Sequence, residues 1–259
     1  MFPSVETIMT YGECSMKLVV VGCFGAYPPR NGATSGYLVE DHTTKVLLDC
    51  GSGVIASLQN YINLNELDAV VFSHYHRDHC ADLECMQYAT MIDMQLEKRK
   101  RPLVMWGNED AGVIPSLDYE KYCIGMRYVE HVPFTIGGLR FTTQANKHDI
   151  PSFSIKVEDS QGGCIVYSGD TEYYDRFSDF AEGVDWLLCE CSLYSDQRGQ
   201  VEGHLCATEA GQIAARASVR NLALTHLPNY GDRESLIQEA GTIYGGKIVL
   251  AYPGMVLKI

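Results

Sequence analysis

Short runs of apolar and β-branched residues alternate with longer stretches whose apolar residues have helical spacing. The runs typical of buried strands lie at 17–22, 37–40, 45–49, 69–73, 103–106, 139–145, 153–157, 164–168, 186–189, 223–225 and 248–251. The helical stretches lie at 53–61, 81–98, 208–219, where Thr208 is the expected N-cap, and 233–244. This alternation predicts an α/β fold rather than an all-α or all-β one.

The same pattern predicts how the chain is divided into domains. No proline- or serine-rich linker interrupts it, so we expect residues 16–259 to form one domain. Residues 1–15 precede the first apolar run, and we expect them to be a loose, disordered N-terminal extension. The segment 107–130 combines four glycines and prolines with three tyrosines, which favours a lid or pocket wall over a core element.

Composition and charge narrow the possible functions. The chain has 259 residues, 46% of them hydrophobic, which is enough to bury a full core and excludes a disordered or collagen-like protein. It has 33 acidic and 20 basic side chains, for a net charge of −13. Because nucleic-acid backbones are bound mainly through Lys and Arg, this acid excess disfavours a protein that coats nucleic acid.

Cysteine usage and the N-terminal sequence bear on location. The ten cysteines form no regular framework, so we expect reduced thiols and a cytoplasmic protein. The N-terminus lacks a basic start followed by an apolar stretch. The first apolar run, 18–27, is too short and too interrupted by glycine to span a bilayer, so we expect no secretion signal and no membrane span.

The candidate chemistry is concentrated after the strand predicted at 69–73. His74, His76, Asp78 and His79 follow that strand within six residues. Buried histidines and aspartates are costly without polar partners, so four of them at the end of a strand indicate a function other than packing. Imidazole and carboxylate are ligands that Zn²⁺ and Mn²⁺ accept, and the cluster predicts a metal site.

Four residues do not complete the shells of two ions, and three later residues are candidates for the remainder. His226 follows a strand directly, as His74 does, and Asp170 follows Gly169 at the end of another strand. His148 lies in a polar turn. Each of these residues alone is also compatible with an ordinary loop, but together with the cluster they supply a complete binuclear set.

The sequence resembles the metallo-β-lactamase-fold superfamily. The resemblance rests on motifs that occur in the family's order from Met16 onward: His74-x-His76-x-Asp78-His79, then His148, then Ser168-Gly169-Asp170-Thr171, then Leu224-Thr225-His226. It implies a four-layer αββα sandwich with metals at one edge. In the family's first motif, similar to 47–53 here, the aspartate matching Asp49 supports a metal-bound histidine through a hydrogen bond.

Within that superfamily the chain is most similar to the ribonuclease-Z-like branch of tRNA 3′-processing endonucleases and small phosphodiesterases. The distinguishing motif is 203–210, in which His204 precedes a predicted helix. The resemblance implies that His204 assists phosphodiester cleavage without binding metal, although a histidine simply packed at a helix start is the alternative. The tRNA-binding arm of the processing enzymes is missing, because only 22 residues separate His148 from Asp170.

These observations lead to a mechanistic hypothesis. His74, His76 and His148 hold one divalent ion, Asp78, His79 and His226 hold a second, and Asp170 bridges the two. Zn²⁺ is the expected metal, with Mn²⁺ or iron left open. The nucleophile is a bridging hydroxide, which Asp78 helps to orient, and His204 stabilises or protonates the leaving oxygen. Glu190 is a candidate hydrogen-bond acceptor behind these residues, although a purely structural bond fits it equally well.

We therefore expect a metal-dependent hydrolase that cleaves a small or cyclic phosphodiester. Large RNA is not an expected partner, and a homodimer is left open. The alternatives are a hydrolase of a lactone, thioester or sulfate ester, a tRNA 3′-processing endonuclease, and a metal-binding or sensor protein without catalysis.

Overall fold

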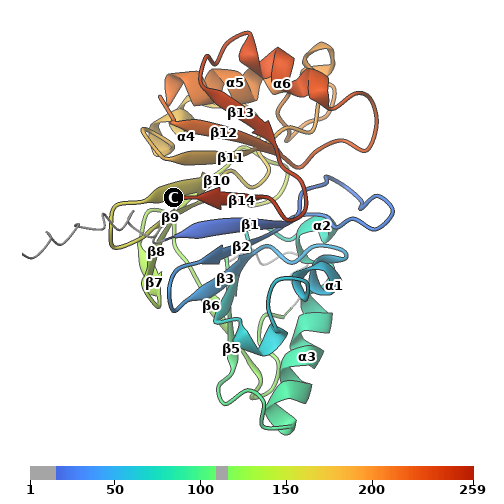
Figure 1. Cartoon of the computed structure of the whole chain (residues 1–259), viewed down its shortest axis with the longest axis vertical. Coiled ribbons are helices and arrows are strands. Elements are labelled where there is room, and N and C mark those ends of the chain that lie inside the picture. Colours follow the sequence, from blue (N-terminus) through green and yellow to red (C-terminus); the bar gives the residue numbers. More distant parts are fainter. Residues whose placement is uncertain (1–15, 109–115) are drawn as a thin grey trace, which may run out of the picture.

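The computed structural model describes residues 16–108 and 116–259, which form two facing β-sheets with helices on both outer sides (Figure 1). This is the expected four-layer αββα sandwich. The N-terminal extension predicted at 1–15 and part of the predicted lid, residues 109–115, lie outside the described residues.

The first sheet contains seven strands in the order β14-β1-β2-β3-β4-β5-β6. Strands β3 to β6 are parallel to one another, whereas β2 is antiparallel to both β1 and β3. The strands are β1 (Lys17–Gly22), β2 (Gly36–Glu40), β3 (Lys45–Leu48), β4 (Ala69–Val71), β5 (Leu103–Gly107), β6 (Cys123–Arg127) and β14 (Val256–Lys258).

The second sheet also contains seven strands, in the order β13-β12-β11-β10-β9-β8-β7. Strands β10 to β13 are parallel, and β9 is antiparallel to both of its neighbours. The strands are β7 (Phe134–Ile136), β8 (Leu139–Ala145), β9 (Phe153–Glu158), β10 (Cys164–Tyr167), β11 (Trp186–Glu190), β12 (Asn221–Thr225) and β13 (Lys247–Leu250).

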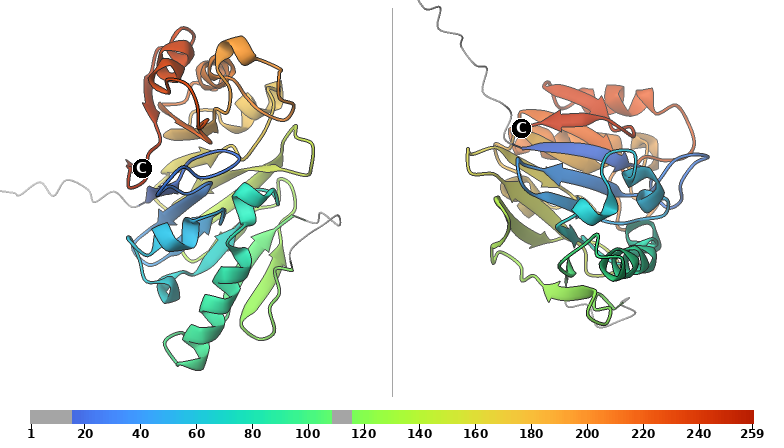
Figure 2. Two further views of the ribbon diagram at one scale, coloured as in Figure 1. Left: turned by 90° about the vertical axis from the view of Figure 1, so that its right-hand side faces the viewer. Right: turned by 60° about the horizontal axis from the view of Figure 1, so that its bottom comes forward.

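Helices cover the outer face of each sheet, as the two further views show (Figure 2). The first sheet carries α1 (Val54–Leu58), α2 (Arg77–Cys80) and α3 (Leu83–Gln95), and the second carries α4 (Asp175–Phe180), α5 (Ala207–Arg216) and α6 (Glu234–Gly241). Two short 3₁₀ turns, η1 (Leu64–Glu66) and η2 (Ser195–Gln197), lie in the connections.

Strand β1 shows why its sequence is apolar throughout. Successive side chains of a strand point to opposite faces. Leu18 and Val20 accordingly pack in the core between the two sheets, whereas Val19 and Val21 pack with the residues of α1 and α3. A strand covered on both faces needs apolar residues at every position, which explains the unbroken run at the start of the domain.

The prediction for 107–130 was wrong over its last third. Cys123–Arg127 forms β6, which pairs in parallel with β5, and the neighbouring Tyr122 and Tyr128 are buried. The short edge strand has a glycine at its centre and exposed residues around it, so its apolar alternation is weak. The elements β7, β14 and α4 were likewise not predicted, since each is only three to six residues long. Strand β14 in addition depends on pairing with β1, which is distant in sequence.

Two predicted helices begin elsewhere in the structure. The stretch expected at 81–98 is helical only as α3, from Leu83 to Gln95, and the short helix α2 that precedes it at Arg77–Cys80 was not predicted. Helix α5 begins at Ala207, with Cys206 rather than Thr208 at its N-cap. The backbone N–H of Cys206 donates to Glu209, which satisfies a group that the helix itself leaves unpaired.

Three further expectations concern the whole chain. The connection between β9 and β10 is a tight turn at 159–163, so the described chain has no arm there. Every cysteine within the described ranges is a free thiol. None of the helices described here is both long and apolar enough to cross a membrane.

Candidate metal centre

The predicted ligands lie at the ends of strands that meet at one edge of the sandwich. His148, Asp170 and His226 follow β8, β10 and β12, respectively. These three strands run in the same direction, since β8 and β10 are both antiparallel to β9 and β10 is connected to β12 through parallel pairs. His74 follows β4 in the facing sheet, so both sheets contribute to one site.

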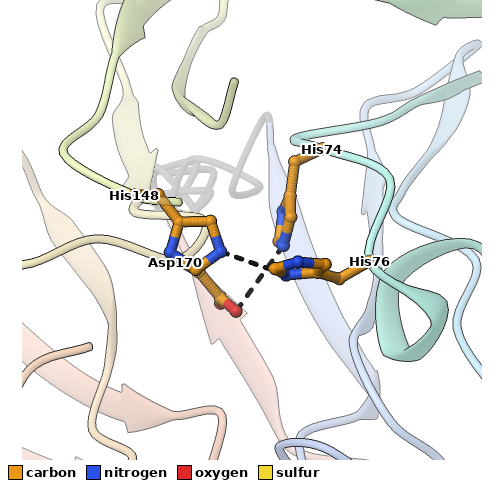
Figure 3. A group of neighbouring side chains, drawn as sticks. All are labelled: His74, His76, His148 and Asp170. Atoms are coloured by element: carbon orange, nitrogen blue, oxygen red, sulfur yellow. Dashed lines mark hydrogen bonds and ion pairs between the residues drawn. The ribbon is translucent and has the colours of Figure 1, made fainter. Parts of the chain in front are cut away.

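One group of donors consists of three histidines and one aspartate, and we call it the imidazole cluster: His74, His76, His148 and Asp170 (Figure 3). Their candidate ligand atoms all lie within 4.8 Å of one another. The Nε2 of His148 is 3.1 Å from the Nδ1 of His76, and the Nε2 of His74 is 3.6 Å from a carboxylate oxygen of Asp170.

A second group contains two carboxylates, and we call it the mixed cluster: Asp78, His79, His226 and Asp170. The Nε2 of His226 lies 3.0 Å from Asp78 and 3.4 Å from Asp170. The Nε2 of His79 lies 3.3 Å from the same oxygen of Asp170. Asp170 therefore belongs to both clusters, and the bridging role predicted for it from the sequence stays a prediction.

Unusual backbone geometry brings these side chains into place. Asp49, His226 and Gly169 all have positive φ angles, of 56°, 51° and 59°. Non-glycine residues rarely adopt this conformation, and such strain concentrates at functional sites. A side chain at Gly169 would in addition place its Cβ 2.8 Å from the carbonyl oxygen of Phe153, so the approach to Asp170 requires glycine.

Asp49 orients His79 from the side opposite the cluster. Its carboxylate accepts hydrogen bonds from the Nδ1 of His79 at 2.8 Å, from the hydroxyl of Tyr167 at 2.7 Å and from the hydroxyl of Ser73 at 2.7 Å. All four side chains are fully buried. With Nδ1 engaged in this way, the Nε2 of His79 is the nitrogen that faces Asp78 and Asp170.

Two other histidines are held in the same way. The Nδ1 of His148 donates to the carbonyl oxygen of Gly203 at 2.9 Å, and the Nδ1 of His226 is 2.7 Å from the hydroxyl of Ser192. In both cases Nε2 faces the cluster. Sequence reasoning gave no role to Ser192, Ser73 and Tyr167, and it used Gly203 only as the first residue of the motif at 203–210.

Burial and charge set the protonation of the ligands. Burial lowers the pKa of His74 well below its usual value and keeps this ring neutral. Burial by itself would raise the pKa of Asp170, but His226 and His79 outweigh it, and the pKa lies well below normal. His79 responds in the opposite way. Burial would lower its pKa, but Asp170, Asp49 and Asp78 raise it well above normal.

The donors fit divalent ions. The Nε2 of His74 and the Oδ1 of Asp170 are buried and have no hydrogen-bond partner within the described part of the chain. Buried polar atoms are normally paired, so these two indicate an interaction that the protein alone does not supply. Imidazoles and ionised carboxylates in groups of four are a ligand set for zinc, manganese or iron.

His204 lies beside both clusters and forms a network of its own. Its Nδ1 is 3.1 Å from Glu190 and 3.9 Å from Asp170, and its ring stacks on that of His226 at 5.4 Å. Burial would lower the pKa of His204, but the carboxylates of Glu190 and Asp170 raise it to about 9. Ser192 connects the network, since it donates to Glu190 at 2.7 Å and contacts the Nδ1 of His226.

Comparison with known proteins shows the family. Residues 44–227 match the family model described as the beta-lactamase superfamily domain, which covers more than half of the chain. The chain belongs to the beta-lactamase superfamily. Its sandwich and the position of its donor clusters agree with the resemblance seen in the sequence.

Three relatives of this superfamily member are informative. YhfI of Bacillus subtilis, described as a probable metallo-hydrolase, is 37% identical over 93% of this chain and 99% of its own length. Its crystal structure superimposes with a TM-score of 0.91, covering 93% of this chain and 98% of that one. Ribonuclease Z of Metallosphaera sedula is 24% identical, with 88% and 94% of the two chains covered. The short form of human tRNase Z has the same fold, at 20% identity, a TM-score of 0.71 and coverage of 94% and 99%.

Proposed function

We propose that this protein is a binuclear metal-dependent phosphodiesterase that cleaves a small or cyclic phosphodiester. Its relatives described as a metallo-hydrolase and as ribonuclease Z support hydrolysis and a phosphodiester bond, respectively. The proposal joins these two descriptions to the residues of the site.

The imidazole cluster would hold one ion and the mixed cluster a second, with Asp170 common to both. We propose zinc, with manganese or iron as the alternatives. When bound, such a pair of ions activates a water molecule and neutralises the phosphoryl oxygens during in-line displacement. Asp78 is ionised, because His79 and His226 lower its pKa against the effect of burial, and it accepts a hydrogen bond from the nucleophile.

The observation that carries the proposal is the position of His204 beside both clusters and Glu190. Its Nδ1 is engaged by Glu190, so Nε2 is the atom that remains to donate a proton. Against the effect of burial, Glu190 favours the protonated ring, because its carboxylate is the nearest charge that raises the pKa of His204. The departing oxygen of a phosphodiester needs a proton, and a positioned imidazolium supplies one. This favours an ester with an oxygen leaving group over a thioester, and the ribonuclease Z relative favours a phosphodiester over a lactone.

The size of the substrate is inferred from charge and from the missing arm. The turn at 159–163 offers no extended surface for RNA, and the net charge of −13 repels a polyanion. Both features weigh against tRNA 3′-end processing and favour a small diester at a locally positive metal centre.

A substrate panel on protein with quantified metal content tests the proposal. The panel contains 2′,3′- and 3′,5′-cyclic nucleotides, a bis-aryl phosphate, lactones and pre-tRNA, with His204→Ala and Asp78→Ala beside the unaltered protein. We expect cleavage of the small phosphodiesters and strong losses in both variants. Cleavage of lactones alone would refute the phosphodiesterase, and bound metal without any turnover would favour a non-catalytic sensor.

Location and assembly belong to the same proposal. The free thiols of the described cysteines support a reducing, cytoplasmic location. A homodimer also remains a prediction, and size-exclusion chromatography with light scattering would test it.

A further inference from the structure

A small pocket opens beside His204 and His226. It has a volume of about 190 Å³. Besides these histidines, its walls include Tyr27, Val201, Pro228 and Tyr230. No Lys, Arg, Asp or Glu is among the lining residues, so the pocket suits an uncharged group rather than a second phosphate.

The loop that contains Tyr27 is connected to the metal centre by hydrogen bonds. The side-chain amide of Asn229 donates to the carbonyl oxygen of Tyr27 at 2.6 Å, which joins two loops that are about 200 positions apart in the sequence. The neighbouring Ala26 donates its backbone N–H to Asp78 at 2.8 Å and has a φ of 60°. This strained loop therefore has a fixed position relative to the mixed cluster.

The opposite wall is equally constrained. The hydroxyl of Tyr230 donates to Gln197 at 2.9 Å, and its ring lies 5.8 Å from that of Tyr194. The hydroxyl of Tyr194 donates to the carbonyl oxygen of Tyr230 at 2.8 Å. Tyr230 is nevertheless 49% exposed and Tyr27 is 61% exposed. The ring of Tyr230 is held in place and left open to solvent, so it is preorganised for binding, since little entropy is lost when it makes contact. Tyr27 is positioned through the backbone of its loop.

We propose that this pocket binds one planar aromatic group of the substrate, a single nucleobase, against Tyr230 and Tyr27. The inference rests on the proposed phosphodiesterase activity and specifies its substrate class as a mononucleoside phosphodiester. The volume of about 190 Å³ is smaller than pockets that take drug-sized ligands, roughly 300–1,000 Å³, and matches one ring system rather than an oligonucleotide. Every base has a π-face, so an aromatic wall selects for the presence of a base more than for its identity.

The kinetic test compares adenosine 3′,5′-cyclic phosphate with the base-free 1-deoxyribose 3′,5′-cyclic phosphate. Stacking of a base on a protein ring predicts that unaltered protein prefers the nucleotide in kcat/KM by about 5-fold or more. Tyr230→Ala or Tyr27→Ala should remove most of this preference and leave cleavage of the base-free compound unchanged. Tyr230→Phe, which keeps the ring, should retain it.

Tyr88→Ala is the matched control, because Tyr88 is a similarly exposed tyrosine on α3, outside the pocket. The proposal is overturned if the alanine variants at 27 and 230 keep the preference. It is equally overturned if they slow both substrates alike, since that result would show a structural role instead.

A binding measurement separates failure of the pocket from failure of the proposed activity. The fluorescence of 2-aminopurine riboside 5′-monophosphate is measured as metal-loaded protein is added, and its quenching gives the Kd. This measurement requires no turnover. We expect Tyr230→Ala to raise the Kd about 5-fold or more, and Tyr88→Ala to leave it unchanged. If neither cyclic phosphate is cleaved but this difference is found, the proposed function is wrong and the base pocket stands. Equal Kd values for all variants would refute the pocket itself.

Discussion

The two donor clusters share Asp170 but differ in charge and in exposure. The imidazole cluster adds three histidines to Asp170, and one of them, His76, has a side chain that is 36% exposed. The mixed cluster adds a second carboxylate, Asp78, and its side chains are at most 12% exposed. Asp49 lies directly behind it and is fully buried.

This difference predicts unequal metal binding. A dication in the mixed cluster faces two carboxylates in a closed, poorly solvated environment, where electrostatic attraction is stronger than near the surface. A dication in the imidazole cluster faces Asp170 and the exposed carboxylate of Asp149, which lies 3.1 Å from the Nε2 of His148 and 3.6 Å from the Nε2 of His76. Solvent screens the attraction of Asp149, because its side chain is 60% exposed. We therefore expect the ion of the mixed cluster to bind more tightly and to exchange more slowly.

The largest effect on metal content and turnover is expected from substitution of Asp170, which both clusters share. Asp170→Asn removes the only carboxylate of the imidazole cluster and one of two in the mixed cluster. We expect the metal content to fall from about two ions per chain to below about one, and the turnover to fall by at least about 10³-fold. Elemental analysis and kinetics on the same sample measure both. A variant that kept two ions would show that Asp170 is not shared.

Substitution of His204 tests whether a third metal-binding group lies beside the two clusters. Glu190, His204 and His226 also lie within ligand distance of one another, so His204 could belong to a third metal-binding group. If His204 acts as an acid, His204→Gln should reduce kcat by about 10²–10⁴-fold with metal content unchanged. Loss of an ion in this variant would assign His204 to the ligands and contradict the acid role. Stoichiometry is measured by elemental analysis.

The seven candidate ligands were predictable because their signals are local. His74 to His79 form one short motif, and Asp170 and His226 each follow a recognisable strand. The structure places all of these residues together with His148 at one edge. Their roles as ligands remain predictions that the metal analyses above test.

The residues that orient the ligands could not be predicted in the same way. Ser192 reaches His226 across 34 positions, and Tyr167 reaches Asp49 across 118. Such contacts depend on the order of strands in two sheets, which no single segment encodes. Strand β6 was missed for a related reason, because its pairing with β5 rather than its own sequence makes it a strand.

Asp49 forms a direct hydrogen bond with a histidine of only one of the two clusters. It contacts His79 of the mixed cluster and no histidine of the imidazole cluster among its described hydrogen bonds. Asp49→Asn should weaken binding of the ion in the mixed cluster about 10–100-fold, as loss of a carboxylate behind a metal-bound histidine does. The other ion should be affected less, because Asp49 reaches His74 only through the hydroxyl of Ser73, which lies 3.0 Å from the Nδ1 of His74. Competition titration with a chelator resolves the two ions.

A milder variant serves as the control for Asp49. Tyr167→Phe removes one hydrogen bond to the same carboxylate and should weaken binding of the same ion by a smaller factor. The melting temperature of the metal-free variants separates this effect from general destabilisation. Equal weakening of both ions would contradict the separation of the clusters.

The smallest effect is expected at Ser192, which connects the mixed cluster to His204 and Glu190. Ser192→Ala removes hydrogen bonds that are typically worth about 0.5–1.5 kcal/mol each, which predicts a loss in kcat of about 2- to 12-fold. Ser235→Ala is the control, because the hydroxyl of Ser235 makes an exposed bond to Asp232. A loss in kcat at full metal occupancy shows that Ser192 acts through His204. Weaker binding of the ion in the mixed cluster, with an unchanged kcat per bound ion, would instead show that Ser192 acts through His226 alone.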